Sequence, residues 1–592
     1  MNRRARPSSF LVLALLATLP AGCDYSGGET RAPREILAGQ IPKSNINPSA
    51  TGTARPGLPA PTNLAESADQ KERQDAILGN VIRLVQSAAT TPGGKHFETA
   101  TKNLNEYFEG GTRPGDYLMS PSTRQFLLTM LPETLVKEFE ATTFDPRFDG
   151  RHLEDCMLYN EIANRIAGEG DDLSRARRVF DWMVRQVQLV PAQSLAPTGM
   201  AQAQARPYDV LLRGMATESE GYWTERGWLF MVLCRQLGID VGLVTYTPRQ
   251  PSRLLAVQPA QPAEAPQPTA WICAALINDK AYLFDQRLGL AIPDAKGDGV
   301  ATLEDAMTDP QILDRLNLPC HGRDYGTTRA DLLASPDKIG ILLDSSRGYV
   351  SPKMRLLQSR LTGKNRTILY RDPIDQREHF AKVLGPRLGS VKLWLLPLSV
   401  ETFLFSNPQF VQATQVSIRL FDGRLPLLYA RMAQLKGDLP EAIQQYVAFR
   451  YARGGTMRDA QKTPIVPVLQ RELDHYATYF LALCNLEMGN TTQAEFFFKQ
   501  TLQKTPEPAP NREYCYMFRW GAHTNLGLLS RAKGDIPAAT MYLSRSDPTK
   551  QSDGNLWLAR ELVWSAPTSP LAAPLPAAPP VTTARPDAAA LR

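Results

Sequence analysis

The stretch from Arg206 to Leu290 decides the fold. It reads RPYDVLLRGMATESEGYWTERGWLFMVLCRQLGIDVGLVTYTP, passes through a Pro/Gln/Ala-rich insert, and resumes as AWICAALINDKAYLFDQRLGL. Residues 224–237 are apolar nearly all round, which predicts a fully buried helix that ends at Gly238. Runs rich in β-branched and aromatic residues then predict strands at 241–246, 271–277 and 282–285. The pattern favours an α+β fold in which a central helix packs on an antiparallel sheet.

The helix exit Cys234-Arg235-Gln236-Leu237-Gly238-Ile239 and the strands after it resemble the transglutaminase-like superfamily, which has a papain-related α+β fold. In that family a cysteine opens the buried helix, a histidine before an aromatic residue opens the next strand, and an aspartate ends the strand after it. The resemblance extends roughly over 173–293, with 177–190 as the helix that precedes the catalytic segment.

The residues at the catalytic positions depart from that family. Its spacing places the nucleophile at Trp223 and the histidine at Thr269, and only the third member, Asp285, is kept. A cysteine at a helix N-terminus is acidified by the helix dipole and by a neighbouring imidazolium, and an indole can replace neither partner. Ser219 could stand in as a nucleophile, but no base is visible for it. The resemblance therefore implies a scaffold that has lost acyl-transfer chemistry.

The histidines leave one alternative open. None of the six lies between His152 and His321, so a Cys/His pair would take its base from outside the core elements. A thiol hydrolase or acyltransferase of transglutaminase type would then use Cys156 or Cys234 with one of these two histidines. Otherwise Cys234 and Cys273 are expected to be inert, small apolar core residues.

Length and composition limit the other possibilities. A chain of 592 residues predicts two to four domains, and 43% hydrophobic with 21% charged residues is ordinary for globular protein. The net charge of +6 does not call for a nucleic-acid partner. The cysteines are scattered, without a CxxC pair or metal-ligand spacing, so we expect no metal and no cofactor.

The N-terminus resembles a bacterial lipoprotein signal. Residues 1–23 combine a basic start, an apolar run and the small residues Ala21-Gly22 before Cys23, although Pro20 stands where a leucine would be expected. The resemblance implies cleavage before Cys23, a lipid on its sulfur, and a membrane-anchored protein of the bacterial cell envelope. Ordinary secretion is the alternative. Residues 24–68, rich in Gly, Ser, Pro, Ala and Asn, predict a flexible tether.

Further segments follow in order. We expect a helical region at 69–172, the transglutaminase-like domain at 173–300 and an α/β extension at 301–424. The insert between Thr247 and Thr269 should loop out between two strands, because a Pro/Gln/Ala-rich run does not fit a central strand. In the extension we expect helices at 303–307 and 352–361, strands at 339–344 and 366–371, and a core segment at 390–405.

Residues 425–564 carry a repeat. Gly437, Gly489 and Gly534 each precede an alanine by five residues, which resembles the helical pairs of tetratricopeptide repeats. The spacings of 52 and 45 residues between these glycines exceed the usual period of about 34. Such arrays bind proteins or peptides on a concave face, which favours a scaffolding role; the alternative is that the pairs only buttress the upstream module. Residues 565–592 predict a disordered Pro/Ala-rich tail.

Overall fold

The computed structural model describes residues 64–88, 95–109, 118–191, 205–218, 224–248, 268–335, 338–406, 426–451, 467–505, 518–545, 547 and 549–564. The chain divides into two units, Met1–Ala76 and Ile77–Arg592. The described residues of the first unit, 64–76, lie in helix α2 (Leu64–Ala88), which includes the last five residues of the predicted tether, 64–68. The predicted signal, the insert at 249–267, the tail, and the residues Cys23, Ser219 and Trp223 lie outside the described residues.

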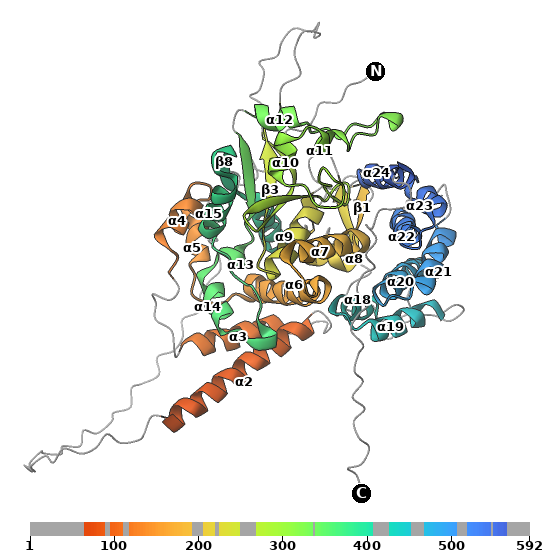
Figure 1. Ribbon diagram of the computed structural model, residues 1–592. Coiled ribbons are helices and arrows are strands. Elements are labelled where there is room, and N and C mark those ends of the chain that lie inside the picture. Colours follow the sequence, from red (N-terminus) through yellow and green to blue (C-terminus); the bar gives the residue numbers. More distant parts are fainter. Residues whose placement is uncertain are drawn as a thin grey trace, which may run out of the picture. The chain divides into compact units, whose positions relative to one another are not determined.

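A six-stranded mixed sheet forms the centre of the second unit (Figure 1). Its order is β6-β5-β4-β3-β7-β8, with every pair antiparallel except the parallel pair β7–β8. The three predicted core strands pair antiparallel, as expected, and the sheet becomes mixed where the chain crosses over through helices between β7 and β8. The strands are β3 (Asp240–Tyr246), β4 (Thr269–Ile277), β5 (Lys280–Asp285), β6 (Leu290–Ala291), β7 (Ile339–Asp344) and β8 (Leu388–Trp394).

Helix α9 (Thr224–Gln236) is the predicted buried helix. Trp228 to Cys234 are all buried, because one side of the helix faces β3 and β4 and the other faces three more helices. Those helices are α6 (Arg151–Ala167), α7 (Asp172–Gln186) and α8 (Pro207–Arg213). Gly238 has φ 79°, the left-handed conformation that ends the helix and favours glycine.

Short local signals fix the edges of this core. Asn278 and Asp279, with φ of 50° and 56°, form the tight turn between β4 and β5. The helix predicted at 177–190 ends at Gln186, and β1 (Gln188–Pro191) then pairs in parallel with β2 (Met215–Glu218). The pairing partner lies more than twenty residues away, so no local pattern indicated this small sheet.

The predicted extension completes the same sheet by supplying β7 and β8. The apolar segment 390–405 splits into the end of β8 and helix α16 (Leu395–Ser406). Residues 366–371 are not a strand. The backbone N–H of Ile368 donates to the side-chain oxygen of Gln236, and those of Leu369 and Tyr370 donate to that of Gln358. The other helices are α3 (His96–Glu109), α4 (Pro121–Leu128), α5 (Glu133–Phe139), α10 (Leu303–Thr308), α11 (Gln311–Asp314), α12 (Arg329–Ala334), α13 (Arg347–Val350), α14 (Pro352–Arg360) and α15 (Pro373–Leu384).

Three helical pairs and a final helix form the C-terminal region. Gly437, Gly489 and Gly534 stand at the turns within the pairs with φ of 90°, 76° and 75°, as the repeated glycines predict. The pairs are α18 (Pro426–Lys436) with α19 (Leu439–Tyr451), α20 (Pro467–Glu487) with α21 (Thr491–Lys504), and α22 (Phe518–Ala532) with α23 (Ile536–Leu543). Helix α24 (Gln551–Trp564) follows.

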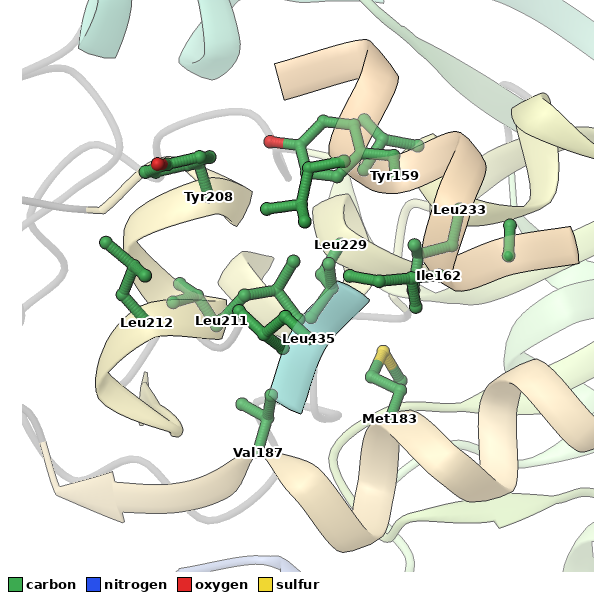
Figure 2. Close-up of a cluster of buried hydrophobic side chains, with 14 of the residues drawn as sticks. Tyr159, Ile162, Met183, Val187, Tyr208, Leu211, Leu212, Leu229, Leu233 and Leu435 are labelled. Carbon is green, nitrogen blue, oxygen red and sulfur yellow. The ribbon is translucent and has the colours of Figure 1, made fainter. Parts of the chain in front are cut away.

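The first helix of each pair packs on the central module. One hydrophobic core runs from α6 and α9 into α18, α20 and α22. Figure 2 shows Leu435 of α18 among side chains of α6, α7, α8 and α9. Polar contacts accompany this packing: Arg431 donates to the carbonyl of Leu211, and Glu487 accepts from Arg165, Trp182 and Gln186.

Candidate functional site

The end of β5 holds Asp285, which is fully buried and whose carboxylate is saturated. Oδ1 accepts from the backbone N–H groups of Arg287 and Leu288, at 2.9 and 3.2 Å, and from Arg287 Nε at 3.1 Å. Oδ2 accepts from Arg287 Nη2 and from the Tyr325 hydroxyl, both at 2.8 Å. Tyr325 accepts in turn from Trp271 Nε1 at 3.0 Å. The carboxylate therefore accepts five hydrogen bonds, and these bonds hold the turn after β5 in place.

Thr269, the position predicted for the base, begins β4. It is exposed and pairs with Tyr246 at the end of β3. Since β4 begins where β5 ends, Thr269 and Asp285 stand at the same end of the sheet. No hydrogen bond joins the two residues, and Trp223, the position predicted for the nucleophile, lies outside the described residues. A threonine hydroxyl does not act as a general base at neutral pH, so this end of the sheet carries no described base.

The first turn of α9 is covered by α24. Arg226 is fully buried; it donates to the Gln286 carbonyl at 3.1 Å, to the Val187 carbonyl, and to Gln551 Oε1 of α24 at 2.8 Å. Burial is the main cause that lowers the pKa of Arg226 to about 9. Its Nε has no partner among the described residues. Helix α24 thus supplies one of the acceptors of the buried guanidinium in the first turn of α9.

Two further contacts hold α24 in this place. Glu218 at the end of β2 accepts from the backbone N–H of Lys550 at 2.7 Å. The α-carbon of Gly554 lies against the carbonyl of Leu288, in the turn between β5 and β6, so closely that a side chain there would collide with it. The α9 start, β2 and the β5–β6 turn therefore all meet the first turn of α24.

Cys234 and Cys273 are core residues. Both are fully buried, and burial raises the pKa of each thiol above its ordinary value. The Cys273 sulfur lies 3.8 Å from the Gly227 carbonyl. No histidine contact is recorded for either thiol among the described residues. His321, the second candidate base, lies in a surface turn beside exposed Cys320.

The structure does bring together Cys156 and His152, the other pair that the sequence left open. They lie four residues apart on α6, with the sulfur 3.5 Å from Nε2 and 3.3 Å from the Tyr349 hydroxyl. His152 Nε2 also lies 2.9 Å from the Leu369 carbonyl, so the ring donates its proton there. Burial lowers the pKa of His152 to about 4 and raises the pKa of the Cys156 thiol.

A catalytic thiol needs the opposite shifts and an open path to substrate. Cys156 has no exposed surface, and both partners are neutral at pH 7. The pair is a buried contact that links α6 to α13 and to residue 369. It does not meet the chemical requirements of a thiol hydrolase.

A small polar hollow beside this pair escaped sequence reasoning. Arg206 donates to Asp155 Oδ2 at 3.1 Å, whereas Asp155 Oδ1 is buried without a partner among the described residues. Burial is the largest cause that raises the pKa of Glu154 and Glu401 to about 8 and the pKa of Asp155 to about 6. Only adjacent acids on an otherwise apolar helix face could have indicated this cluster. Its lining is Phe148, Arg151, His152, Asp155, Arg206, Arg347, Gly348 and Glu401.

Comparison with known proteins finds no matching family model, curated protein or solved structure. Within the described ranges, no helix combines the length and apolar character needed to cross a bilayer. Among the same residues, no group of three or more His, Cys, Asp or Glu side chains is placed to hold a metal ion.

Proposed function

We propose that this protein is a lipoprotein of the bacterial cell envelope that binds other proteins, built on a transglutaminase-like domain without acyl-transfer activity. The observation that carries the loss of activity is the saturated carboxylate of Asp285. In a catalytic triad the third residue must accept a hydrogen bond from the imidazole and orient it. Here Arg287, Tyr325 and Leu288 already occupy that capacity.

The cover over the α9 start supports the same proposal. Activation of a nucleophile by a helix dipole requires free N–H groups and room for a substrate at that end of the helix. Arg226 is instead buried there and bonded to Gln551 of α24. The first turn of α9 therefore offers a buried guanidinium in contact with α24.

A gain-of-function variant tests this part of the proposal. Trp223→Cys alone should not restore amine incorporation or peptide hydrolysis, because position 269 still lacks a base. The double variant Trp223→Cys/Thr269→His should also remain inactive, because the Asp285 carboxylate already accepts hydrogen bonds from other residues and cannot orient the new imidazole. Measurable turnover by the double variant would contradict the proposal.

A thiol-alkylating active-site probe tests the rival thiol enzyme in the unmodified protein. We expect the exposed thiol of Cys320 to label readily and the thiols of Cys156, Cys234 and Cys273 to label slowly at pH 7, since these three are buried and their pKa values are raised. One hyper-reactive cysteine, lost in Cys156→Ala or Cys234→Ala, would favour the hydrolase instead.

For partner binding we infer that the tetratricopeptide-like pairs use their second helices. The first helices are buried against the central module, so the face that such arrays usually offer is occupied. Phe496 on α21 and Met541 on α23 are each 49% exposed, which is unusual for large apolar side chains. A photo-crosslinking amino acid at position 496 or 541 should give a discrete adduct in envelope preparations. The same probe at Leu333, equally exposed on α12, serves as the control and should give none.

The membrane anchor has its own test. Metabolic labelling with a fatty-acid analogue should mark the protein, and Cys23→Ser should abolish the label. Labelling that persists in the variant would place the lipid elsewhere, and absence of labelling in the parent would favour ordinary secretion.

A further inference from the structure

One segment carries the whole positive excess of the chain. Residues 345–371 contain seven arginine or lysine residues and no aspartate or glutamate. The net charge of the entire protein is +6, so the rest of the chain is close to neutral. The segment spans α13, α14 and the turn η6 (Gly363–Asn365).

Three of these cations face inward and have acidic partners. Each joins the segment to another element: Arg347 to Glu138 at 3.0 Å, Lys353 to Asp149 at 2.6 Å, and Arg371 to Asp240 at 2.6 Å. Their role is structural, because a buried cation requires a partner. They do not contribute to a free basic surface.

Three other cations face solvent close together in the chain. Arg360 ends α14, Lys364 lies in η6 and Arg366 follows it; all three are exposed. Within the described part of the chain, none of their side chains has an ion pair or a hydrogen bond. Residues 360–366 thus hold three unpaired, exposed cations and no acidic residue, which gives this part of the surface a local positive charge.

We propose that this basic face, Arg360, Lys364 and Arg366, rests against the anionic headgroups of the membrane to which the protein is anchored. The inference rests on the proposed lipid anchor at Cys23. Forty residues separate Cys23 from α2. As a flexible coil they would reach about 35 Å. An anchored body therefore stays near the surface, where its effective concentration makes a few charge contacts sufficient.

The chemistry of the face favours headgroups over other polyanions. Recognition of single-stranded nucleic acid uses exposed aromatic rings on which bases stack. The two aromatic residues of the segment, Tyr349 and Tyr370, are buried. The three cations are also not among the residues that line the hollow at Arg323 or the hollow at Arg206. A planar lattice of phosphates needs neither feature.

Vesicle binding by unlipidated protein tests the proposal. The chain beginning at position 23 and carrying Cys23→Ser is mixed with phosphatidylcholine vesicles containing 30% phosphatidylglycerol, and with pure phosphatidylcholine vesicles. We expect binding to the anionic vesicles only, and its loss in high salt. The triple variant Arg360→Gln/Lys364→Gln/Arg366→Gln should weaken the partition coefficient about fivefold for each charge removed.

A matched control removes the same charge elsewhere. Lys280, Lys296 and Lys338 are exposed and have no ion pair among the described residues; their triple Gln variant should bind as the parent does. Equal binding by the Arg360/Lys364/Arg366 variant and the parent would overturn the proposal, as would equal binding to neutral vesicles. Binding of a single-stranded oligonucleotide as tight as that of the vesicles, and lost in the same variant, would overturn the choice of partner. Because the protein used carries no lipid, a failure here is separate from a failure of the fatty-acid labelling.

Discussion

At the scale of single residues, Asp285 separates structure from catalysis. Its carboxylate is buried between Arg287 and Tyr325, so Asp285→Asn would leave a largely buried guanidinium without its counter-charge. We expect the free energy of unfolding to fall by about 3 kcal/mol, the usual cost of breaking such a pair. Urea unfolding measures it. Asp279, which belongs to a different and exposed ion pair, provides the control, since Asp279→Asn should leave the unfolding midpoint in place. An unchanged midpoint in Asp285→Asn would contradict a structural role for Asp285.

Glu154 gives a pH dependence with a definite sign. Its pKa is raised from 4.5 to about 8, chiefly by burial, so the folded protein holds a proton that the unfolded chain releases between these values. Stability contributed by this group is therefore present at low pH and is lost as pH rises from about 4.5 to about 8. Glu154→Gln keeps the shape without the charge. The free energy of unfolding of this variant, minus that of the parent, should rise with pH by up to about 1.4 kcal/mol per unit in this window. Denaturant unfolding at pH 5, 6, 7 and 8 measures it, and a constant difference would contradict the prediction.

At the scale of elements, the contact of α24 with the β5–β6 turn depends on a glycine. A side chain at position 554 would collide with the Leu288 carbonyl, so Gly554→Ala should push the start of α24 away from the sheet. Hydrogen exchange should then rise at 285–290 and in the first turn of α24. Gly79→Ala in α2 is the control, because no atom lies near that position and alanine favours a helix. Unchanged exchange in Gly554→Ala would mean that the helix does not cap this end of the sheet.

Elements were predictable where their signals are local. The buried helix α9 follows from an unbroken apolar run closed by Gly238, and the β4–β5 hairpin from Asn278-Asp279 between apolar strands. Residues 366–371 have the composition of a strand, yet Gln236 and Gln358 satisfy their backbone from other elements. The contact of Tyr325 with Asp285 escaped prediction for the same reason, since Tyr325 lies forty residues further along the chain, whereas the other donors, Arg287 and Leu288, follow Asp285 within three residues. Long-range partners leave no periodic signal.

At the scale of the whole second unit, the central sheet and the helical pairs share one core. Sequence boundaries at 300/301 and 424/425 mark changes of composition, but β7 and β8 complete the sheet, and Leu435 and Phe480 join the hydrophobic cluster beneath it. Burial of the first helix of each pair would couple the proposed partner binding on the second helices to the stability of the module. Fold class was therefore predictable in outline, whereas the joining of these parts was not.

This shared core makes the two parts dependent on each other. A chain ending at residue 425 would expose Leu211, Leu229 and Met183, which are buried near Leu435 in the full protein (Figure 2). We expect it to aggregate on size-exclusion chromatography and to lack a cooperative thermal transition, because exposed apolar surface of this kind promotes association. Co-expression of 426–564 as a separate chain should restore a soluble complex, which distinguishes a missing interface from general damage. A monomeric, cooperatively folded 1–425 fragment would show that the pairs are an appended domain and that their first helices are available to a partner.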